Sequence, residues 1–255
     1  MTALAQAAPP HLTHRSEIPP EDRLIVALDV PTVAEAREVV HDLGDRISFY
    51  KIGAQLQLAG GVQLASDLIS EGKKIFLDSK LWDIEQTITS TVQTAAKMRV
   101  TFLTVHGERK VIEAAVRGRG SSNLKILAVT FLTNLDEHDL KDLHFSGSVE
   151  EFVKFRTQLA ITAGADGVIA SGQEAARIRE IAKNKLTIVT PGIRPKGSPT
   201  NDQRRAVTPL EAIKSGADYL VVGRPILTAS SKIGAADSII KEIEKGLAKQ
   251  IAVVR

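Results

Sequence analysis

Charged side chains crowd the end of an apolar run in the stretch FLDSKLWDIEQT, residues 76–87. Asp78 and Lys80 are two residues apart, so in a β-strand their side chains leave the backbone on one face, and Asp83 lies in the turn beyond. Lys51 stands near the end of another apolar run, ISFYKIG, and supplies a second ammonium group. Because unpaired buried charges are costly, we expect these two lysines and two aspartates to compensate one another.

Either a structural ion-pair network or a catalytic site would explain this cluster. A single Asp-x-Lys pair at the rim of a fold is most often structural. Here both lysines follow apolar strand cores, and other strand ends add an acid at Asp29 and a guanidinium at Arg224. Charged groups that lie together in a cleft and influence each other's protonation are candidates for catalysis. The sequence therefore favours a charged catalytic site.

A long polar connection, PGIRPKGSPTNDQRRAV at residues 191–207, follows a further apolar run, and the next such run ends in Gly-Arg-Pro at residues 223–225. Glycine, proline, serine and asparagine are ordinary turn residues, so a plain solvated loop is one interpretation. The length favours a lid or binding loop, because connections longer than ~12–15 residues are commonly functional. Backbone N–H groups and a basic side chain at this place suit a phosphate group.

The chemical groups stand at the ends of short apolar runs that alternate with segments of helical periodicity. We predict eight strands, at residues 24–29, 47–53, 74–80, 101–106, 124–130, 167–171, 186–192 and 218–223. Helical segments between them include residues 32–43, 62–72, 84–98 and 148–164. Strict alternation favours an α/β fold, a single (β/α)8 TIM barrel with catalytic groups at the carboxyl ends of its strands; an open doubly wound sheet is the alternative.

Length and composition limit the remaining choices. Residues 1–22 carry four prolines without periodicity, so we predict a disordered tail at 1–22 and a catalytic barrel at 23–255. A net charge of +3 is too small to predict a nucleic-acid partner. The absence of cysteine excludes thiol catalysis. No apolar run is long enough to span a bilayer, and the opening lacks a signal h-region, so we expect no membrane partner and a cytoplasmic location.

Several blocks occur in order between about Leu24 and Ile226: ALDV, FYKIG, FLDSKLWDI, TVHG, LAVTFLT, GADGVIAS, TPGIRPKG with DQRRAVTP, and GADYLVVGRPI. The Asp-x-Lys-x-x-Asp motif belongs to a wide suprafamily, but its combination with Lys-Ile-Gly, Thr-Pro-Gly-Ile-Arg-Pro and Val-Val-Gly-Arg-Pro is specific. Through these blocks the chain resembles the bacterial branch of the orotidine 5′-monophosphate decarboxylase family. The resemblance implies conversion of orotidine 5′-monophosphate to uridine 5′-monophosphate and CO₂ in de novo pyrimidine biosynthesis.

The resemblance also implies a role for each matching residue. Lys51, Asp78, Lys80 and Asp83 would form the catalytic array, with Asp83 reaching the active site of the partner subunit in a homodimer. The implied substrate-binding residues are Asp29 at the ribose, Thr87 near the ribose of the neighbouring subunit, Thr133 at the pyrimidine, Gln203 and Arg224 at the phosphate, Gly223 beside Arg224, and Arg194 in the lid. The chain departs from the family pattern in having Trp82 where a histidine is common and Glu85-Gln86 where Pro-Asn is usual.

Loss of CO₂ from C6 of the pyrimidine leaves a carbanion whose lone pair lies in the ring plane, so the ring cannot delocalise it. Electrostatic stabilisation must then carry the reaction, with Lys80 as the expected proton donor and Asp78 close to the substrate carboxylate. We expect no cofactor and no metal, because the sequence has no clustered histidine and carboxylate ligands. His106, at the end of the fourth predicted strand, is expected to pack rather than to catalyse.

Two other functions are compatible with part of this pattern. A magnesium-dependent relative that acts on phosphorylated keto-sugars would share the Asp-x-Lys-x-x-Asp motif, but such relatives carry an acidic residue where this chain has Lys51. A non-catalytic protein that binds a phosphorylated ligand would be expected to have lost part of the charged array. The complete array favours the decarboxylase over both.

Overall fold

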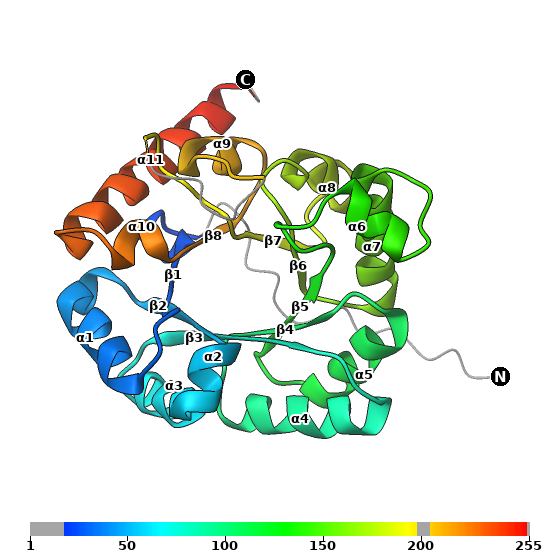
Figure 1. Ribbon diagram of the computed structural model, residues 1–255, viewed down its shortest axis with the longest axis horizontal. Coiled ribbons are helices and arrows are strands. Elements are labelled where there is room, and N and C mark those ends of the chain that lie inside the picture. Colours follow the sequence, from blue (N-terminus) through cyan, green and yellow to red (C-terminus); the bar gives the residue numbers. More distant parts are fainter. Residues whose placement is uncertain (1–17, 198–204, 254–255) are drawn as a thin grey trace.

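The computed structural model describes residues 18–197 and 205–253, and within these ranges eight parallel strands close into a barrel (Figure 1). The strands are β1 (Leu24–Ala27), β2 (Phe49–Gly53), β3 (Lys74–Leu81), β4 (Phe102–His106), β5 (Lys125–Val129), β6 (Gly167–Ile169), β7 (Thr187–Thr190) and β8 (Tyr219–Val222). Each strand pairs with its neighbour in sequence, and β8 pairs with β1. The predicted strands and the closed barrel are confirmed, and the open sheet is excluded.

Helices surround the barrel (Figure 1). They are α1 (Val33–Leu43), α2 (Ala54–Leu56), α3 (Val62–Ser70), α4 (Glu85–Lys97), α5 (Arg109–Arg119), α6 (Glu137–Asp142), α7 (Val149–Ala163), α8 (Ala175–Ala182), α9 (Pro209–Lys214), α10 (Arg224–Leu227) and α11 (Lys232–Val253). Ser148 and Thr208 begin α7 and α9 with capping boxes, since each side chain accepts an N–H three residues on and the glutamate there accepts the N–H of the cap residue. Among the described residues, no helix is long and apolar enough to cross a membrane.

Aromatic side chains fill the interior of the barrel. Phe102 is the centre of this cluster, with ring centroids 5.0 Å from Phe49, 5.1 Å from Tyr219 and 6.0 Å from Phe76. The rings meet at tilted or edge-to-face angles, which suit their quadrupoles. Burial raises the pKa of Tyr219 to about 12, so this phenol stays neutral. The lower end of the barrel, where the strands begin, is therefore a packed core.

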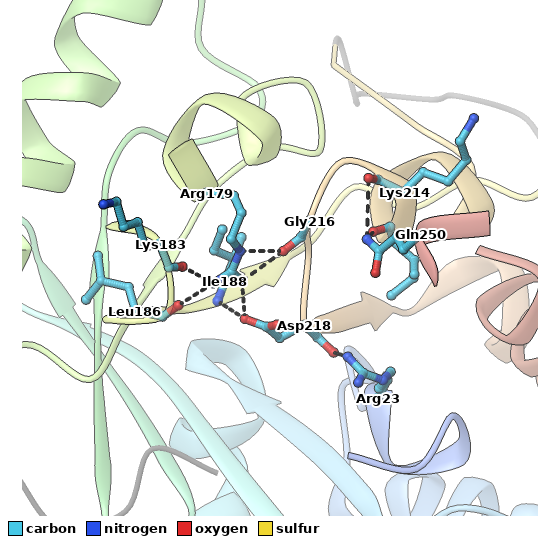
Figure 2. Close-up of polar contacts among 10 residues, drawn as sticks. Arg23, Arg179, Lys183, Leu186, Ile188, Lys214, Gly216, Asp218 and Gln250 are labelled. Atoms are coloured by element: carbon cyan, nitrogen blue, oxygen red, sulfur yellow. Dashed lines mark hydrogen bonds and ion pairs between the residues drawn. The ribbon is translucent and has the colours of Figure 1, made fainter. Parts of the chain in front are cut away.

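A buried Arg–Asp pair secures the lower end of β8 (Figure 2). Asp218 precedes the strand and is 3% exposed; its Oδ2 accepts from the Ile188 N–H at 2.8 Å and from Arg179 Nη2 at 2.6 Å. Arg179 also donates to the carbonyl of Gly216, while Arg23 Nη1 donates to the carbonyl of Asp218 at 3.1 Å. One acid thus joins the starts of β1, β7 and β8.

The same arrangement recurs at β6, where Asp166 takes the place of Asp218. Its Oδ2 accepts from the Ile126 N–H at 2.8 Å, and its Oδ1 pairs with Arg119 of α5. Both acids stand in a Gly-Ala-Asp sequence whose glycine has a positive φ, 82° at Gly164 and 106° at Gly216. The repeated motif therefore ends a helix and clamps the strand that follows.

The predicted tail at residues 1–22 is described only from Ile18 onward. Ile18 is buried, and its carbonyl accepts from Arg23 Nε at 3.1 Å. Asp22 accepts from Ser48 Oγ and Lys74 Nζ, both at 3.0 Å. The last five residues of this segment thus contact the lower end of the barrel, whereas residues 1–17 lie outside the described part of the chain.

Candidate active site

A cavity of about 510 Å³ opens at the carboxyl ends of the strands. Its lining combines charged groups from β1 to β3 with apolar side chains of the barrel wall and the basic residues that follow β7 and β8. The lining includes Asp29, Lys51, Gly53, Phe76, Asp78, Lys80, Phe131, Leu132, Thr133, Arg194, Gly223 and Arg224. The cavity therefore lies where a barrel of this kind places its catalytic groups.

Lys51 joins two carboxylates at the floor of the cavity. Its Nζ lies 2.8 Å from Asp29 Oδ1 and 3.4 Å from Asp78 Oδ2, and its side chain is 9% exposed. Parallel pairing of β2 with β3 sets Gly53 opposite Asp78, which brings the two charged strand ends together. A Cβ on Gly53 would lie 3.1 Å from Asp29 Oδ1 and 3.2 Å from Lys51 Nζ, so the glycine leaves room for this pair.

Lys80 reaches the same carboxylate from a bulge in β3. The pairing of β3 with β4 shifts between Leu77 and Leu81, and Lys80 has a φ of 46°, which is unusual for a residue with a side chain. Lys80 Nζ donates to Asp78 Oδ1 at 2.8 Å. Asp78 thus lies between two ammonium groups.

Thr104, in the middle of β4, holds this arrangement in place. Its hydroxyl donates to Asp78 Oδ1 at 3.0 Å and accepts from the backbone N–H of Lys80 at the same distance. The residue is fully buried. Sequence reasoning missed Thr104, although a threonine between the apolar residues of FLTVH was a visible signal of a polar group facing the barrel interior.

The two buried members of the array keep each other charged. Burial by itself would lower the pKa of Lys51, but the carboxylates of Asp29 and Asp78 outweigh it, so the pKa lies above its ordinary value. Burial would raise the pKa of Asp78, but Lys51 and Lys80 outweigh it and hold the pKa below its ordinary value. Among the described residues, no group of three or more histidine or carboxylate side chains is arranged to hold a metal ion.

Basic residues line the cavity beyond the array. Arg194 is buried, and its Nη1 donates to the Ile193 carbonyl at 2.8 Å. Arg224 is the first residue of α10 and follows Gly223 at the end of β8. Gln203, predicted to bind phosphate, lies outside the described residues. The cavity therefore combines a lysine–aspartate floor with two guanidinium groups from the β7 and β8 sides.

Thr133 also lines the cavity, in the connection after β5, and its residue surface is 9% exposed. Two other predicted residues do not line it. Thr87 is exposed in the first turn of α4, and Asp83 is exposed with its Oδ1 accepting the Ile84 N–H at 2.6 Å. The expected compensation of the lysines by Asp83 of the same chain is therefore wrong, because Asp83 lies outside the cavity that they line and its carboxylate accepts the N–H of the next residue instead.

The surface around Asp83 is apolar. Trp82 and Ile84 are 71% and 72% exposed. The Trp82 ring stacks on His106 with centroids 5.4 Å apart, and His106 Nδ1 lies 3.7 Å from Glu108 Oε2. The predicted packing role of His106 is therefore consistent with its stacking on Trp82.

Comparison with known proteins identifies the family of the chain. The model of the orotidine 5′-phosphate decarboxylase / HUMPS family matches residues 22–239. The chain is 50% identical over 235 residues to a protein of Nitrobacter winogradskyi named orotidine 5′-phosphate decarboxylase, covering 92% of this chain and 98% of that one. A protein of the same name from Afipia carboxidovorans is 51% identical over 224 residues, which are 88% of this chain and 95% of that one.

A solved structure has the same fold. The crystal structure of orotidine 5′-phosphate decarboxylase from Lactobacillus acidophilus superposes with a TM-score of 0.76 at 34% identity, covering 86% of this chain and 98% of that chain. The family match spans most of the barrel, including every described residue that lines the cavity. The chain therefore belongs to the orotidine 5′-phosphate decarboxylase / HUMPS family.

Proposed function

We propose that this chain decarboxylates orotidine 5′-monophosphate to uridine 5′-monophosphate and CO₂, as a cytoplasmic step of de novo pyrimidine biosynthesis. The supporting observation is the Lys51–Asp78–Lys80 array, held by Asp29 and Thr104 at the floor of a cavity that also contains two arginines. Such an array suits a reaction that builds negative charge at one carbon and then needs a proton there.

Lys80 donates the proton in the proposed mechanism. Its side chain is 36% exposed in the open cavity, so the ammonium can reach a ligand while Asp78 holds it. Removal of CO₂ leaves the electron pair of the broken C6–C bond on C6 of the ring. The ammonium stabilises this pair electrostatically, and transfer of its proton to C6 completes the product.

Asp78 and Lys51 set the field in which Lys80 acts. The depressed pKa of Asp78 keeps its carboxylate ionised, and in our proposal it faces the carboxylate of the substrate. Repulsion between these two anions would be relieved as CO₂ departs. Lys51 balances Asp78 from the other side, so the buried acid is not left uncompensated. No step of this mechanism uses a cofactor.

Other residues bind the rest of the nucleotide in this proposal. Arg224 and Gln203 bind the phosphate with Gly223 beside Arg224, Arg194 belongs to the lid, Asp29 binds the ribose hydroxyls, and Thr133 contacts the pyrimidine. A guanidinium matches a phosphate group by presenting two parallel N–H donors. Because these contacts are remote from the broken bond, their binding energy would orient the substrate rather than take part in bond cleavage.

We further propose that two chains form a homodimer that shares its active sites. Asp83 and Thr87 lie outside the cavity of their own chain, and the exposed side chains of Trp82 and Ile84 flank Asp83. A second copy seated on this surface would cover the apolar groups and bring the partner's Asp83 toward Lys80. The carboxylate absent from each array would then come from the other chain.

Mixed dimers test this sharing. Lys80→Ala and Asp83→Ala are each expected to be inactive, whereas a refolded mixture regains about one quarter of wild-type activity, because one site in half of the dimers is complete. A mixture as inactive as its components contradicts sharing, provided that sedimentation confirms mixed dimers.

The decarboxylation itself is tested by following the ultraviolet absorbance of orotidine 5′-monophosphate with purified protein and EDTA. We expect rapid conversion to uridine 5′-monophosphate that EDTA does not slow. Folded dimeric protein that leaves the substrate unchanged would overturn the proposal, and phosphorylated keto-sugars with Mg²⁺ would be tested next. Conversion that EDTA abolishes would contradict the metal-free mechanism.

A further inference from the structure

Arg205 connects three segments beside the cavity, although it does not line the cavity itself. Its side chain is 11% exposed, and its Nη1 lies 2.5 Å from Glu174 Oε1, in the connection between β6 and α8. Its Nη2 donates to the carbonyl of Leu132 at 2.8 Å. The guanidinium carbon lies 5.6 Å from the centroid of the Phe131 ring. Three partners, acidic, polar and aromatic, thus share one planar group.

The backbone of Arg205 is also fixed. Its carbonyl accepts from the hydroxyl of Ser171, a buried residue after β6, at 3.2 Å. Two residues further on, Val207 forms a parallel bridge with Ile193, and its carbonyl accepts from the Arg194 N–H at 2.9 Å. The end of the β7–α9 connection that carries Arg205 is therefore tied both to β6 and to the segment after β7.

The contact with Leu132 bears directly on the cavity. The Leu132 carbonyl belongs to the peptide unit whose nitrogen is that of Thr133, and Phe131, Leu132 and Thr133 all line the cavity. A hydrogen bond to this carbonyl fixes the plane of the peptide unit, and the ring of Phe131 fixes the residue before it. From outside the cavity, Arg205 therefore contacts both the peptide unit that leads into Thr133 and the residue before that unit.

We propose that Arg205 is a positioning residue for pyrimidine binding, which acts through the Leu132 peptide and the Phe131 ring to hold Thr133 against the base. Glu174 has a supporting role, because its carboxylate orients the guanidinium. The inference rests on the proposed function, in which Thr133 contacts the pyrimidine.

A lysine would not reproduce this set of contacts. Its single ammonium can keep the ion pair with Glu174, but it has no second nitrogen to direct at the Leu132 carbonyl and no planar group to lie against Phe131. Burial raises the pKa of Glu174, and the charge of Arg205 opposes this change. A lysine would therefore preserve the charge balance of the buried pair while removing the contact that orients the peptide.

Arg205→Lys separates positioning from stability. We expect its melting temperature to stay close to that of the wild type, while KM for orotidine 5′-monophosphate rises about tenfold, the effect of one misdirected hydrogen bond. The value of kcat should change less than about twofold, because a contact with the base is made in both the bound and the transition state. Arg177→Lys, an exposed arginine of α8 paired with Glu180, is the matched control and should leave both constants unchanged.

A double mutant identifies the route of the effect. Thr133→Val removes the hydroxyl at constant shape and should raise KM on its own. In that background Arg205→Lys should raise KM less than about twofold further, because the group that it positions is gone. Arg205→Ala is measured in the same two backgrounds. An increase in KM equal to that of Arg205→Lys in each background would also show that Arg205 acts through Thr133.

Several outcomes would overturn the proposal. Wild-type KM in Arg205→Lys and Arg205→Ala, both folded, would mean that the guanidinium positions nothing. Equal KM increases in the wild-type and Thr133→Val backgrounds would show that Arg205 does not act through Thr133, and would leave the decarboxylase function intact. If Thr133→Val had the KM of the wild type, the hydroxyl of Thr133 would not contact the pyrimidine, and Arg205 would have no base contact to position. If the wild-type protein converts no substrate, the proposed function fails, which is a separate result.

Discussion

One buried carboxylate organises the charged residues of the cavity. Asp78 accepts from Lys80 and Thr104 and pairs with Lys51, and Lys51 in turn pairs with Asp29. The bulge in β3 and the positive φ of Lys80 allow its ammonium to approach Asp78. Backbone strain of this kind persists where the surrounding contacts determine it, and the N–H of Lys80 is held by Thr104. The residues therefore act as a unit rather than as separate ion pairs.

Lys80→Ala is expected to keep the fold and to lower kcat by on the order of 10³-fold or more, because it removes both the proton donor and the charge beside the reacting carbon. Lys74→Ala is the matched control, since Lys74 stands at the other end of the same strand and pairs with Asp22 at the surface. The ultraviolet assay measures both variants, with circular dichroism as the test of folding. Activity near that of the wild type in folded Lys80→Ala would remove Lys80 from the mechanism.

The pKa shifts predict how stability depends on pH. The pKa of Asp78 is lowered in the folded state, so its contribution is present above the unfolded value of about 3.9 and is lost as pH falls through the lower folded value. The pKa of Lys51 is raised, so its contribution is present below about 10.4 and is lost as pH rises through the higher folded value. Both contributions should therefore be constant near neutral pH.

Urea unfolding of Asp78→Asn at a series of pH values tests the acidic limb. The variant should be less stable than the wild type at pH 7, and the difference should shrink as pH falls below about 4, where the wild type loses the same ionised group. Asp45→Asn changes a fully exposed acid and should show no such convergence. A difference that stays constant down to the acid transition would mean that Asp78 does not stabilise the fold through its charge.

At the scale of the elements, the alternation of apolar runs and helical segments was sufficient to predict all eight strands and the site at their carboxyl ends. Lys51, Asp78 and Lys80 were predicted together because a parallel barrel brings strand ends to one rim. Thr104 and Arg205 were missed because their partners come from distant segments of the chain, such as Glu174 for Arg205. The spacing alone wrongly placed Asp83 among the ion pairs of its own chain, whereas the family resemblance implied a place at a partner subunit.

The two Gly-Ala-Asp motifs have no part in the cavity and should act on stability alone. Arg179→Ala leaves Asp218, 5% exposed at its side chain, with a buried charge and no guanidinium from α8. We expect the free energy of unfolding to fall by about 3 kcal/mol, as when one partner of a buried pair is removed. The values of kcat and KM should be unchanged, because the motif lies at the opposite end of β8 from Arg224.

Urea unfolding and the ultraviolet assay together measure this separation of stability from activity. Arg117→Ala serves as the control, since Arg117 pairs with Glu85 at the surface with 53% exposure and should change the unfolding free energy little. If Arg179→Ala were as stable as this control, the Gly-Ala-Asp motif would not be a clamp. If Arg179→Ala changed KM strongly at wild-type stability, the residues at the lower end of the barrel would influence substrate binding at the upper end.

At the scale of the whole molecule, one end of the barrel stabilises the fold and the other end contains the candidate active site. The lower end, where the strands begin, contains the aromatic core and the Arg–Asp clamps. The upper end, where the strands finish, contains the charged array, the cavity and the positive φ of Lys80. Trp82 and Ile84 flank Asp83 outside the cavity, and both expose most of their apolar side chains. The proposed homodimer accounts for this surface, because it covers the apolar groups and completes the array in one step.

Dilution should therefore lower the specific activity as dimers dissociate. Trp82→Ala is expected to move the midpoint of this loss to a protein concentration at least about tenfold higher, because a buried tryptophan is a common energetic centre of an interface. At protein concentrations well above the midpoint its kcat should approach that of the wild type. Phe155→Ala, an exposed aromatic of α7, is the matched control and should not move the midpoint. Sedimentation at the same concentrations measures the dimer directly. Full activity in a sedimenting monomer would contradict the shared site, whereas loss of activity in step with loss of the dimer would tie catalysis to assembly through this one surface.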